Sequence, residues 1–246
     1  YSLNRTDCFV ILEVNLKTFK MKNIVVFFVL VLLPFMGGSY TWQSFCPDTI
    51  HATNISIGVG SSKGVICSPE GMYLWEEDIE QWTFYTYGLP VTGATWLDDN
   101  KILVAMGEGT WSDGIYTFDL ATHLFDVVEW IVKPNFIMII PVLDENTNTF
   151  TDEYFVGSQY GGLYRSVDGL TWTEVPYFNG KGCKAMDFFG EHLVVTETES
   201  DINIHWSDDY GVNWYEAASA TWITDLKFNN NGVLYGVFPN YSNSSG

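Results

Sequence analysis

Short runs of alternating apolar and polar residues fill the chain from about residue 50 onward, and clusters of turn residues separate them. A period of two residues is typical of β-strands that bury one face. Turn residues flanked by β-branched and aromatic residues predict hairpins around 98–100, Gly190 and 229–232. No run keeps a helical period, and the stretch 141–155 has the composition of a polar loop. The pattern therefore predicts an all-β fold without helices.

A longer repeat groups these runs. Similar stretches begin at Gly71, Gly114, Gly162 and Ile202, at intervals of roughly 40 to 48 residues, the length of one propeller blade. Each stretch has an alternating run, an acidic turn and an aromatic residue that opens another run. Four strands per repeat predict a β-propeller of four-stranded antiparallel blades. We assign the blades to residues 50–87, 91–130, 134–177 and 181–219, with part of a fifth in 221–246.

Such a set of about four and a half blades does not obviously close into a ring. Propellers close to remove their exposed sheet edges, and rings of 4 to 8 blades are typical. We therefore expect the natural protein to be longer, with six or seven blades. A closed five-bladed ring with one irregular blade is the alternative.

The amino-terminal region has the pattern of a secretory signal. A basic start at 21–22 precedes the apolar run 24–36, and small residues at 37–39 suit cleavage before Tyr40. The run is shorter than the roughly 20 apolar residues of a membrane span, so an anchor is the weaker alternative. Residues 1–20 have no sustained pattern and are interpreted as upstream-frame translation. We expect a secreted, cell-surface or periplasmic protein without membrane insertion after cleavage.

The chain is strongly acidic, with a formal net charge of −19. A surface of this sign repels phosphate backbones and anionic membranes, so a nucleic-acid partner is not expected. Neutral glycans, cations and proteins remain as partners. The charge by itself is also explained by solubility.

Cysteine usage does not indicate a disulfide framework. The chain has four cysteines, and three of them follow the predicted cleavage point: Cys46, Cys67 and Cys183. An exported setting permits one bridge, for which Cys46 and Cys67 are the predicted pair.

Two segments carry a specific turn motif. "SVDGLTW" at 166–172 and "SDDYGVNW" at 207–214 resemble the Asp-box, or bacterial neuraminidase repeat, and the first two blades contain degraded versions. The resemblance implies a sialidase-like β-propeller. In such a motif the Asp accepts hydrogen bonds from a tight turn, the Gly takes positive φ, and the Trp packs between sheets. The structural residues are then Ser166, Asp168, Gly169, Trp172, Ser207, Asp209, Gly211 and Trp214.

The resemblance raises the question of enzyme activity. Sialidases grip the substrate carboxylate with three arginines, whereas residues 40–246 contain one, Arg165. A complete sialidase site is therefore not expected, and no catalytic residue is assigned. Other propeller glycosidases need two carboxylates about 5 to 10 Å apart, and this chain has too many acidic residues for a pair to be chosen.

A candidate binding face follows from blade topology. Loops between the second and third strands share one face with the connections between blades, and the motif turns lie at the other. Acidic side chains beside Trp and Tyr on this face suit a neutral sugar, whereas solvated loops are the simpler explanation of the same residues. The candidate ligand-binding residues are Glu108, Trp111, Asp113, Gln159, Tyr160, Glu197, Glu199 and Asp201.

Metal chemistry has little support. The histidines fall in separate blades, so no zinc site is predicted, and the only cofactor considered is calcium at Glu197, Glu199 and Asp201. The leading hypothesis is an exported, non-catalytic binding module for a glycan or a protein. The alternatives are a fragment of a secreted glycoside hydrolase-type propeller and an assembly or stability factor.

Overall fold

The computed structural model describes residues 52, 54–57, 64–76, 81–144, 147–198, 202–220 and 223–237. The chain divides into residues 1–49 and residues 50–246, and every described residue belongs to the second unit. The predicted signal sequence lies outside the described residues. Within them, no helix is both long and apolar enough to cross a membrane.

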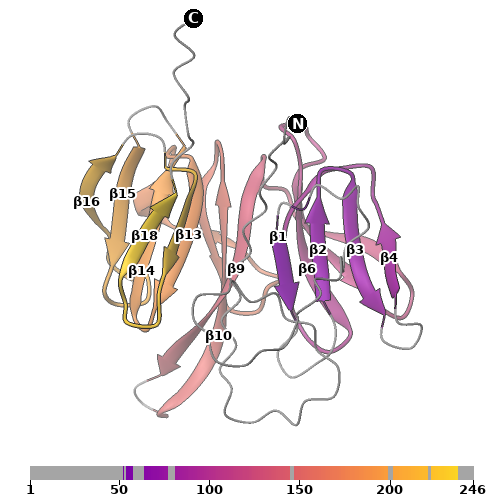
Figure 1. The fold of residues 1–246 in the computed structure, drawn as a ribbon, viewed down its shortest axis with the longest axis horizontal. Coiled ribbons are helices and arrows are strands. Elements are labelled where there is room, and N and C mark those ends of the chain that lie inside the picture. Colours follow the sequence, from indigo (N-terminus) through magenta and orange to yellow (C-terminus); the bar gives the residue numbers. More distant parts are fainter. Residues whose placement is uncertain are drawn as a thin grey trace, which may run out of the picture. The chain divides into compact units, whose positions relative to one another are not determined.

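The second unit consists of consecutive antiparallel sheets, drawn from indigo to yellow in Figure 1. Four sheets have four strands each and the last has two, always in chain order. The first two sheets are β1 (Asn54–Ile57), β2 (Gly64–Ser68), β3 (Gly71–Glu76), β4 (Gln81–Tyr85), and β5 (Val91–Trp96), β6 (Lys101–Met106), β7 (Gly114–Asp119), β8 (Leu124–Glu129). The third and fourth are β9 (Pro134–Asp144), β10 (Thr149–Ser158), β11 (Gly162–Ser166), β12 (Thr173–Glu174), and β13 (Cys183–Phe189), β14 (His192–Glu197), β15 (Ile202–Ser207), β16 (Tyr215–Ala220). The fifth is β17 (Asp225–Phe228) with β18 (Leu234–Val237).

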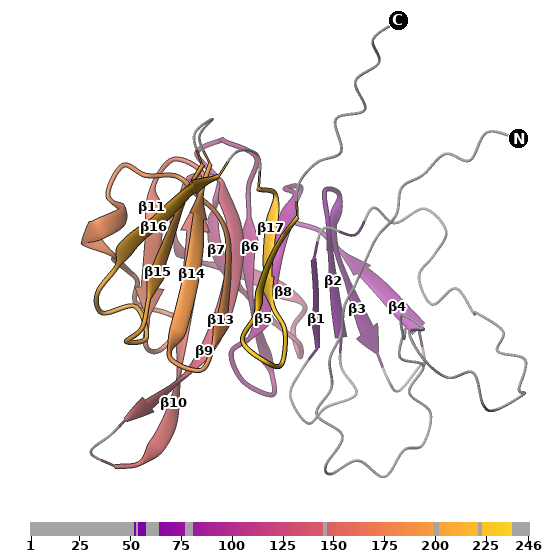
Figure 2. The same ribbon diagram turned by 60° about the vertical axis from the view of Figure 1, so that its left-hand side comes forward.

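The first strands of successive sheets contact one another in the series β1, β5, β9, β13, β17. The sheets therefore stand face to face around these inner strands, as Figures 1 and 2 show for the described strands. This arrangement is a β-propeller of four-stranded blades, and it confirms the predicted fold class.

An apolar core lies between each pair of neighbouring sheets. Strand β6 illustrates why the sequence builds it: Ile102 and Val104 enter the core shared with the first sheet, whereas Leu103 and Ala105 enter the core shared with the third. Successive side chains of a strand point to opposite faces, so an uninterrupted apolar run serves two cores at once. All four of these side chains are fully buried.

The predicted polar loop at 141–155 is wrong. This stretch forms the far end of a long hairpin, in which Asp144 on β9 pairs with Thr149 on β10. Asn148 takes positive φ, and its N–H donates to the carbonyl of Asp144 at 2.7 Å. The hairpin projects beyond the neighbouring strands in Figure 2, and the four consecutive residues 149–152 of β10 are all exposed. A two-stranded ribbon satisfies its own backbone, so a polar composition does not prevent strand formation.

Cys67 carries a free thiol, contrary to the predicted bridge with Cys46, which lies outside the described residues. The side chain is fully buried in the core between the first two sheets, and burial raises the pKa of the Cys67 thiol. Its place on the core side of β2 gives it an apolar packing role. One turn of 3-10 helix, Pro176–Phe178, is the single helical element among the described residues.

The two motif turns have nearly identical hydrogen bonds. Asp168 accepts from the backbone N–H groups of Leu170 and Thr171, at 2.8 and 2.7 Å, and from the hydroxyl of Ser166 at 2.9 Å. These bonds, first that from Thr171, lower the pKa of Asp168 to about 2. Gly169 has φ of 70°, and its carbonyl accepts from the indole of Trp172 at 3.1 Å.

The second turn repeats this pattern with one extra residue. Ser207 donates to Asp209 at 2.8 Å, and the indole of Trp214 donates to the carbonyl of Gly211 at 2.9 Å. Gly211 has φ of 81°, and Trp214 is buried in the core between the third and fourth sheets. Both turns connect the third and fourth strands of their sheets.

Candidate functional site

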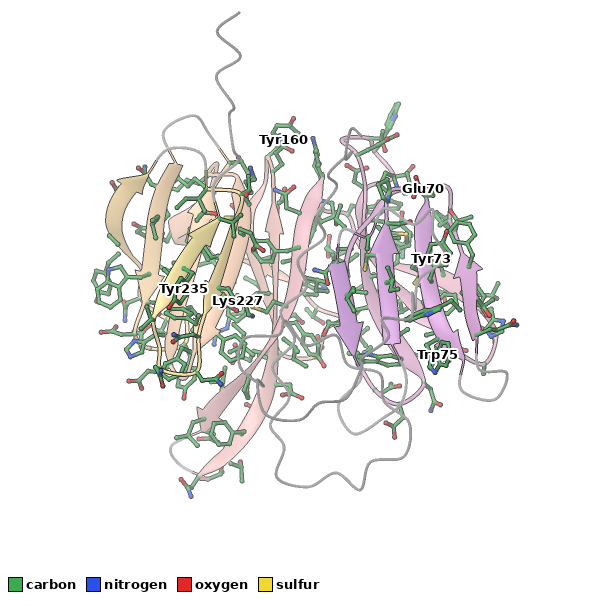
Figure 3. All side chains as sticks on the ribbon, in the orientation of Figure 1. Glu70, Tyr73, Trp75, Tyr160, Lys227 and Tyr235 are labelled. Atoms are coloured by element: carbon green, nitrogen blue, oxygen red, sulfur yellow. The ribbon has the colours of Figure 1, made fainter. Side chains whose placement is uncertain are left out.

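The strand order places the candidate loops together. Because strands alternate in direction, the connections β2–β3, β6–β7, β10–β11 and β14–β15 lie at the same end as the connections between sheets. We call this end the linker face and define it by residues 86–90, 107–113, 130–133, 159–161 and 175–182. Figure 3 labels Tyr160 on one of these loops and Glu70 on the equivalent loop of the first sheet.

The backbone of the linker face is held by one bond that recurs in three sheets. The residue after the second strand donates its N–H to the carbonyl of the residue before the first strand. The pairs are Gly107 to Pro90 at 3.0 Å, Gln159 to Lys133 at 2.9 Å and Thr198 to Gly182 at 2.9 Å. Each loop is thus fixed to the connection that enters its own sheet, so side chains on the loops stand on a rigid base.

Asp113 is buried and organises the 107–113 loop instead of facing solvent. Its two carboxylate oxygens accept five hydrogen bonds at 2.7–3.1 Å. The donors are the N–H groups of Glu108, Gly109, Thr110 and Lys133 and the hydroxyl of Thr110. Burial opposes ionisation, but the backbone bonds together lower the pKa of Asp113. The carboxylate is therefore fully used within the protein.

Glu197 is also turned inward. It accepts a hydrogen bond from Nε2 of His205 at 2.7 Å and lies 3.5 Å from the ammonium of Lys181. The other ring nitrogen of His205 is 3.1 Å from the hydroxyl of Tyr177, which donates to it when the ring is neutral. His205 is fully buried, and this burial lowers its pKa despite the bond to Glu197.

The remaining members of the proposed calcium set, Glu199 and Asp201, lie outside the described residues. Within the described part of the chain, no cluster of three or more acidic, His or Cys side chains has the arrangement of a metal site. The position of Glu197 beside a cation and an imidazole suits an internal hydrogen-bond network.

Aromatic side chains are the exposed feature of the linker face. Trp111 is 94% exposed and Tyr160 is 61% exposed, as expected for contact residues. The structure adds Tyr87 and Trp130, at 52% and 58%, which sequence reasoning missed. Both contact the ring of Tyr116, with centroids 5.2 and 6.3 Å away. Their position in the short connections that leave the first and second sheets is the signal that could have identified them.

Polar groups border these aromatic rings. The ammonium of Lys133 lies 5.8 Å from the ring centre of Tyr160, and the amide of Gln159 is 3.3 Å from the Tyr160 hydroxyl. The hydroxyl of Tyr116 donates to the carbonyl of Ser112 at 2.5 Å, beside Trp111 in the chain. Glu108 is exposed. The face therefore combines aromatic surface with hydrogen-bonding groups of both signs.

Fold and linker face together define a β-propeller protein with an aromatic loop face. No family model and no curated protein matches the chain. Solved structures do match. A GH74 xyloglucanase from Xanthomonas campestris superposes with a TM-score of 0.60 at 16% identity, covering 80% of this chain and 35% of that one.

Two further solved propellers have a similar level of likeness. An ancestral GH74 enzyme has a TM-score of 0.51 at 12% identity, covering 76% of this chain and 32% of its own. YCF48, solved bound to D1 peptide, has a TM-score of 0.53 at 11% identity, covering 77% and 62%. The chain thus spans between about a third and three fifths of these structures' lengths, and identities this low establish the fold alone.

Proposed function

We propose that this chain is an exported, non-catalytic binding module of the Asp-box propeller type, and that its linker face binds a glycan or a protein partner. The observation that carries the proposal is the exposure of Tyr87, Trp111, Trp130 and Tyr160 at one end of the sheets. Rigid aromatic rings provide contact area at a small cost in side-chain entropy, and they stack on sugar rings or on apolar side chains.

The support of these loops favours binding as well. Asp113 holds the 107–113 loop that presents Trp111, and the backbone N–H of Lys133 joins it from the connection that leaves the same sheet. A binding surface that is already ordered loses less entropy when its ligand arrives. The buried carboxylate of Asp113 fixes the backbone of this loop in one conformation, as expected for a loop that presents side chains to a ligand.

Three charged side chains that a catalytic site could have used, Arg165, Asp113 and Glu197, form internal contacts instead. Arg165 forms an ion pair with buried Glu153 and lies over the ring of Phe155, 5.5 Å from its centre. Asp113 and Glu197 are occupied by internal hydrogen bonds. A glycosidase needs one carboxylic acid and one carboxylate beside an open sugar site, and none of these groups is free for that role.

Both ligand classes have precedent on this fold. YCF48 was solved with a peptide bound, and another neighbour is a xyloglucanase. The net charge of −19 favours neutral or cationic ligands over anionic ones. We therefore expect a neutral glycan or a basic peptide, and we base the proposed export on the signal-like apolar run at 24–36.

The test is a glycan array and a basic-peptide array probed with the folded protein from residue 40 onward, with calcium and with a chelator. Selective binding should weaken roughly ten-fold or more in Trp111→Ala and Tyr160→Ala, about 1.4 kcal/mol or more. Phe150→Ala is the matched control, because Phe150 is 66% exposed on the projecting hairpin. Binding lost equally in the control, or no binding on either array, would overturn the proposal. Release of reducing sugar would favour the glycoside hydrolase alternative.

A further inference from the structure

The projecting end of the β9–β10 hairpin leaves one strand edge open. Strand β10 pairs with β9 over its whole length, but it pairs with β11 only from Tyr154 to Ser158. Among the described strands, none lies beside the outer edge of residues 149–153, which project in Figure 2. In an antiparallel pair, the backbone N–H and C=O groups of alternate residues point away from the partner strand. These groups of 149–153 are therefore available to a further strand.

The two edges of the projecting hairpin differ in sequence. On β9, Pro141 pairs with Asp152 of β10. Proline is tolerated in a strand where its nitrogen faces away from the partner, and there it denies an added strand one hydrogen bond. On β10, Thr149, Phe150 and Thr151 favour the extended conformation, and 149–153 contains no proline, lysine or bulge. The outer edge of β10 is therefore the one open to pairing.

Three segments meet beside this edge. A Cβ on Gly169 would lie 2.7 Å from the side chain of Leu97 and 3.6 Å from the ring of Tyr154. The β5–β6 turn, the first motif turn and β10 thus come together around Tyr154. Each segment carries an exposed carboxylate next to these contacts, or on the same face of the strand. They are Asp98, Asp168 and Asp152.

The negative charge of these three aspartates is not balanced by ion pairs. None of them forms an ion pair with a basic side chain among the described residues. Lys101, at the end of the same turn as Asp98, lies opposite Asp119 in the strand register. Burial, followed by the charges of the three aspartates, raises the pKa of Tyr154, as a local excess of negative charge does.

The two faces of the open edge have different chemistry. Successive side chains of an added strand would point to opposite faces. One face meets the three aspartates, whereas the other meets Thr149, Thr151 and Glu153, whose charge is balanced by Arg165. Basic side chains at alternate positions of the added strand are therefore complementary to this edge. A second copy of the chain is not, because each copy carries a net charge of −19.

We propose that residues 149–153 of β10 bind an extended segment of a partner protein that has lysine or arginine at alternate positions. The segment adds to the sheet as a further strand: its backbone pairs with β10, and the aspartates select its basic side chains. The site goes beyond the linker face, because β9 leaves that face at Pro134 and carries the hairpin to the opposite end of the sheet.

The test is calorimetric titration of the purified, folded protein with a peptide in which lysine alternates with threonine. We expect binding that weakens as salt is raised. The same peptide with glutamate in place of lysine, or with every backbone nitrogen methylated, should not bind. Hydrogen exchange should slow at alternate amides within 149–153, because only alternate residues face the added strand.

Two variants locate the binding edge. The double variant Asp98→Asn with Asp152→Asn should weaken binding by about three- to ten-fold, as expected for two exposed charge pairs. Asp126→Asn is the matched control: it removes an exposed aspartate from β8, the outermost strand of its sheet, and should leave binding unchanged. In the second variant, Asn-Gly replaces residues 141–152 and joins the paired Ile140 and Glu153 by a two-residue turn. This shortened hairpin should abolish binding, and thermal melting checks that it is folded.

Several outcomes would overturn the site. They are no binding of the lysine peptide, equal binding of the methylated peptide, binding retained by the shortened hairpin, and equal loss in Asp126→Asn. Trp111→Ala should leave the affinity for this peptide unchanged, since Trp111 lies on the linker face. Failure here is therefore distinguishable from failure of the linker-face function.

Discussion

The side-chain amide of Asn135 donates a hydrogen bond to the carbonyl oxygen of Cys183, 2.7 Å away, and so joins the inner strand of the third sheet to that of the fourth. Thr92 joins the second sheet to the third in the same way. Each bond gives a backbone carbonyl of the next sheet a side-chain donor, which offsets the cost of removing that carbonyl from water.

Loss of this tie should cost stability. Asn135→Leu removes the donor and leaves the Cys183 carbonyl without its partner, so we expect a loss of about 1 to 2 kcal/mol in unfolding free energy by urea titration. Asn179→Ala, at an exposed turn position, is the control and should change stability by less than about 0.5 kcal/mol. Equal losses in the two variants would contradict a specific role of the Asn135 bond.

Gly157 is required by the ring of Phe136. A Cβ on residue 157 would lie 2.1 Å from Cε1 of Phe136, which is almost fully buried and cannot move away. Gly157→Ala should therefore destabilise the protein by about 1 to 3 kcal/mol. In a Phe136→Ala background the same change should cost much less, and a double-mutant cycle by chemical unfolding measures the difference. Additive effects would show that the clash is relieved elsewhere.

Protonation of His205 should destabilise the fold. Burial lowers the pKa of His205 below its ordinary value, so the unfolded chain binds the proton more tightly than the folded one. The resulting stability is fully present above pH of about 6.5 and is lost as the pH falls toward the folded-state pKa. Unfolding free energies between neutral and mildly acidic pH should decline, and His205→Gln should remove this component. His192→Gln, at an exposed position, should retain it.

Asp113 should matter for order in the 107–113 loop. Asp113→Asn keeps the size of the side chain but turns an amide N–H toward donors of the loop, and we expect a loss of about 1 to 3 kcal/mol. Hydrogen exchange at Gly109 and Thr110 should accelerate in the variant, because their N–H groups lose an acceptor. Glu108→Gln is the control, since the Glu108 side chain is exposed. Unchanged exchange would contradict the role assigned to Asp113.

Asp168 should stabilise its turn down to strongly acidic pH. Its hydrogen bonds lower the pKa of Asp168 to about 2, so its contribution is present above the unfolded-state pKa of roughly 3.9 and disappears as the pH falls toward 2. Asp168→Ala should lower the melting temperature at neutral pH, and the difference from the parent should vanish near pH 2. A difference that persists there would mean that the carboxylate acts through something other than its charge.

Prediction from sequence worked best where structure is local. The motif turns at Asp168 and Asp209 depend on residues within a few positions of each other, and the repeat of alternating runs predicted the antiparallel sheets of a β-propeller. The prediction of a polar loop at 141–155 was wrong, because polar residues such as Asp152 do not reveal that the backbone is paired in a hairpin. Amino-acid composition indicates whether side chains are buried, and the projecting end of this hairpin leaves the side chains of 149–152 exposed.

The candidate site was likewise predicted correctly only in part. Trp111 and Tyr160 are exposed as expected, but Asp113 and Glu197 are buried and occupied. Their partners, Lys133 and His205, come from other strands or connections, and the spacing of these residues along the chain does not predict the contacts. Residue type alone could not separate a solvent-facing carboxylate from one that holds a loop.

The sequence by itself determined the alternation, the blade length and the turn chemistry, because each depends on neighbours within a strand or hairpin. The tertiary structure alone decided which carboxylates, among them Asp113 and Glu197, form internal hydrogen bonds. Burial and pairing depend on which strands lie side by side across sheets. Those contacts join residues about a blade apart, so only the packed sheets could bring Asn135 to Cys183.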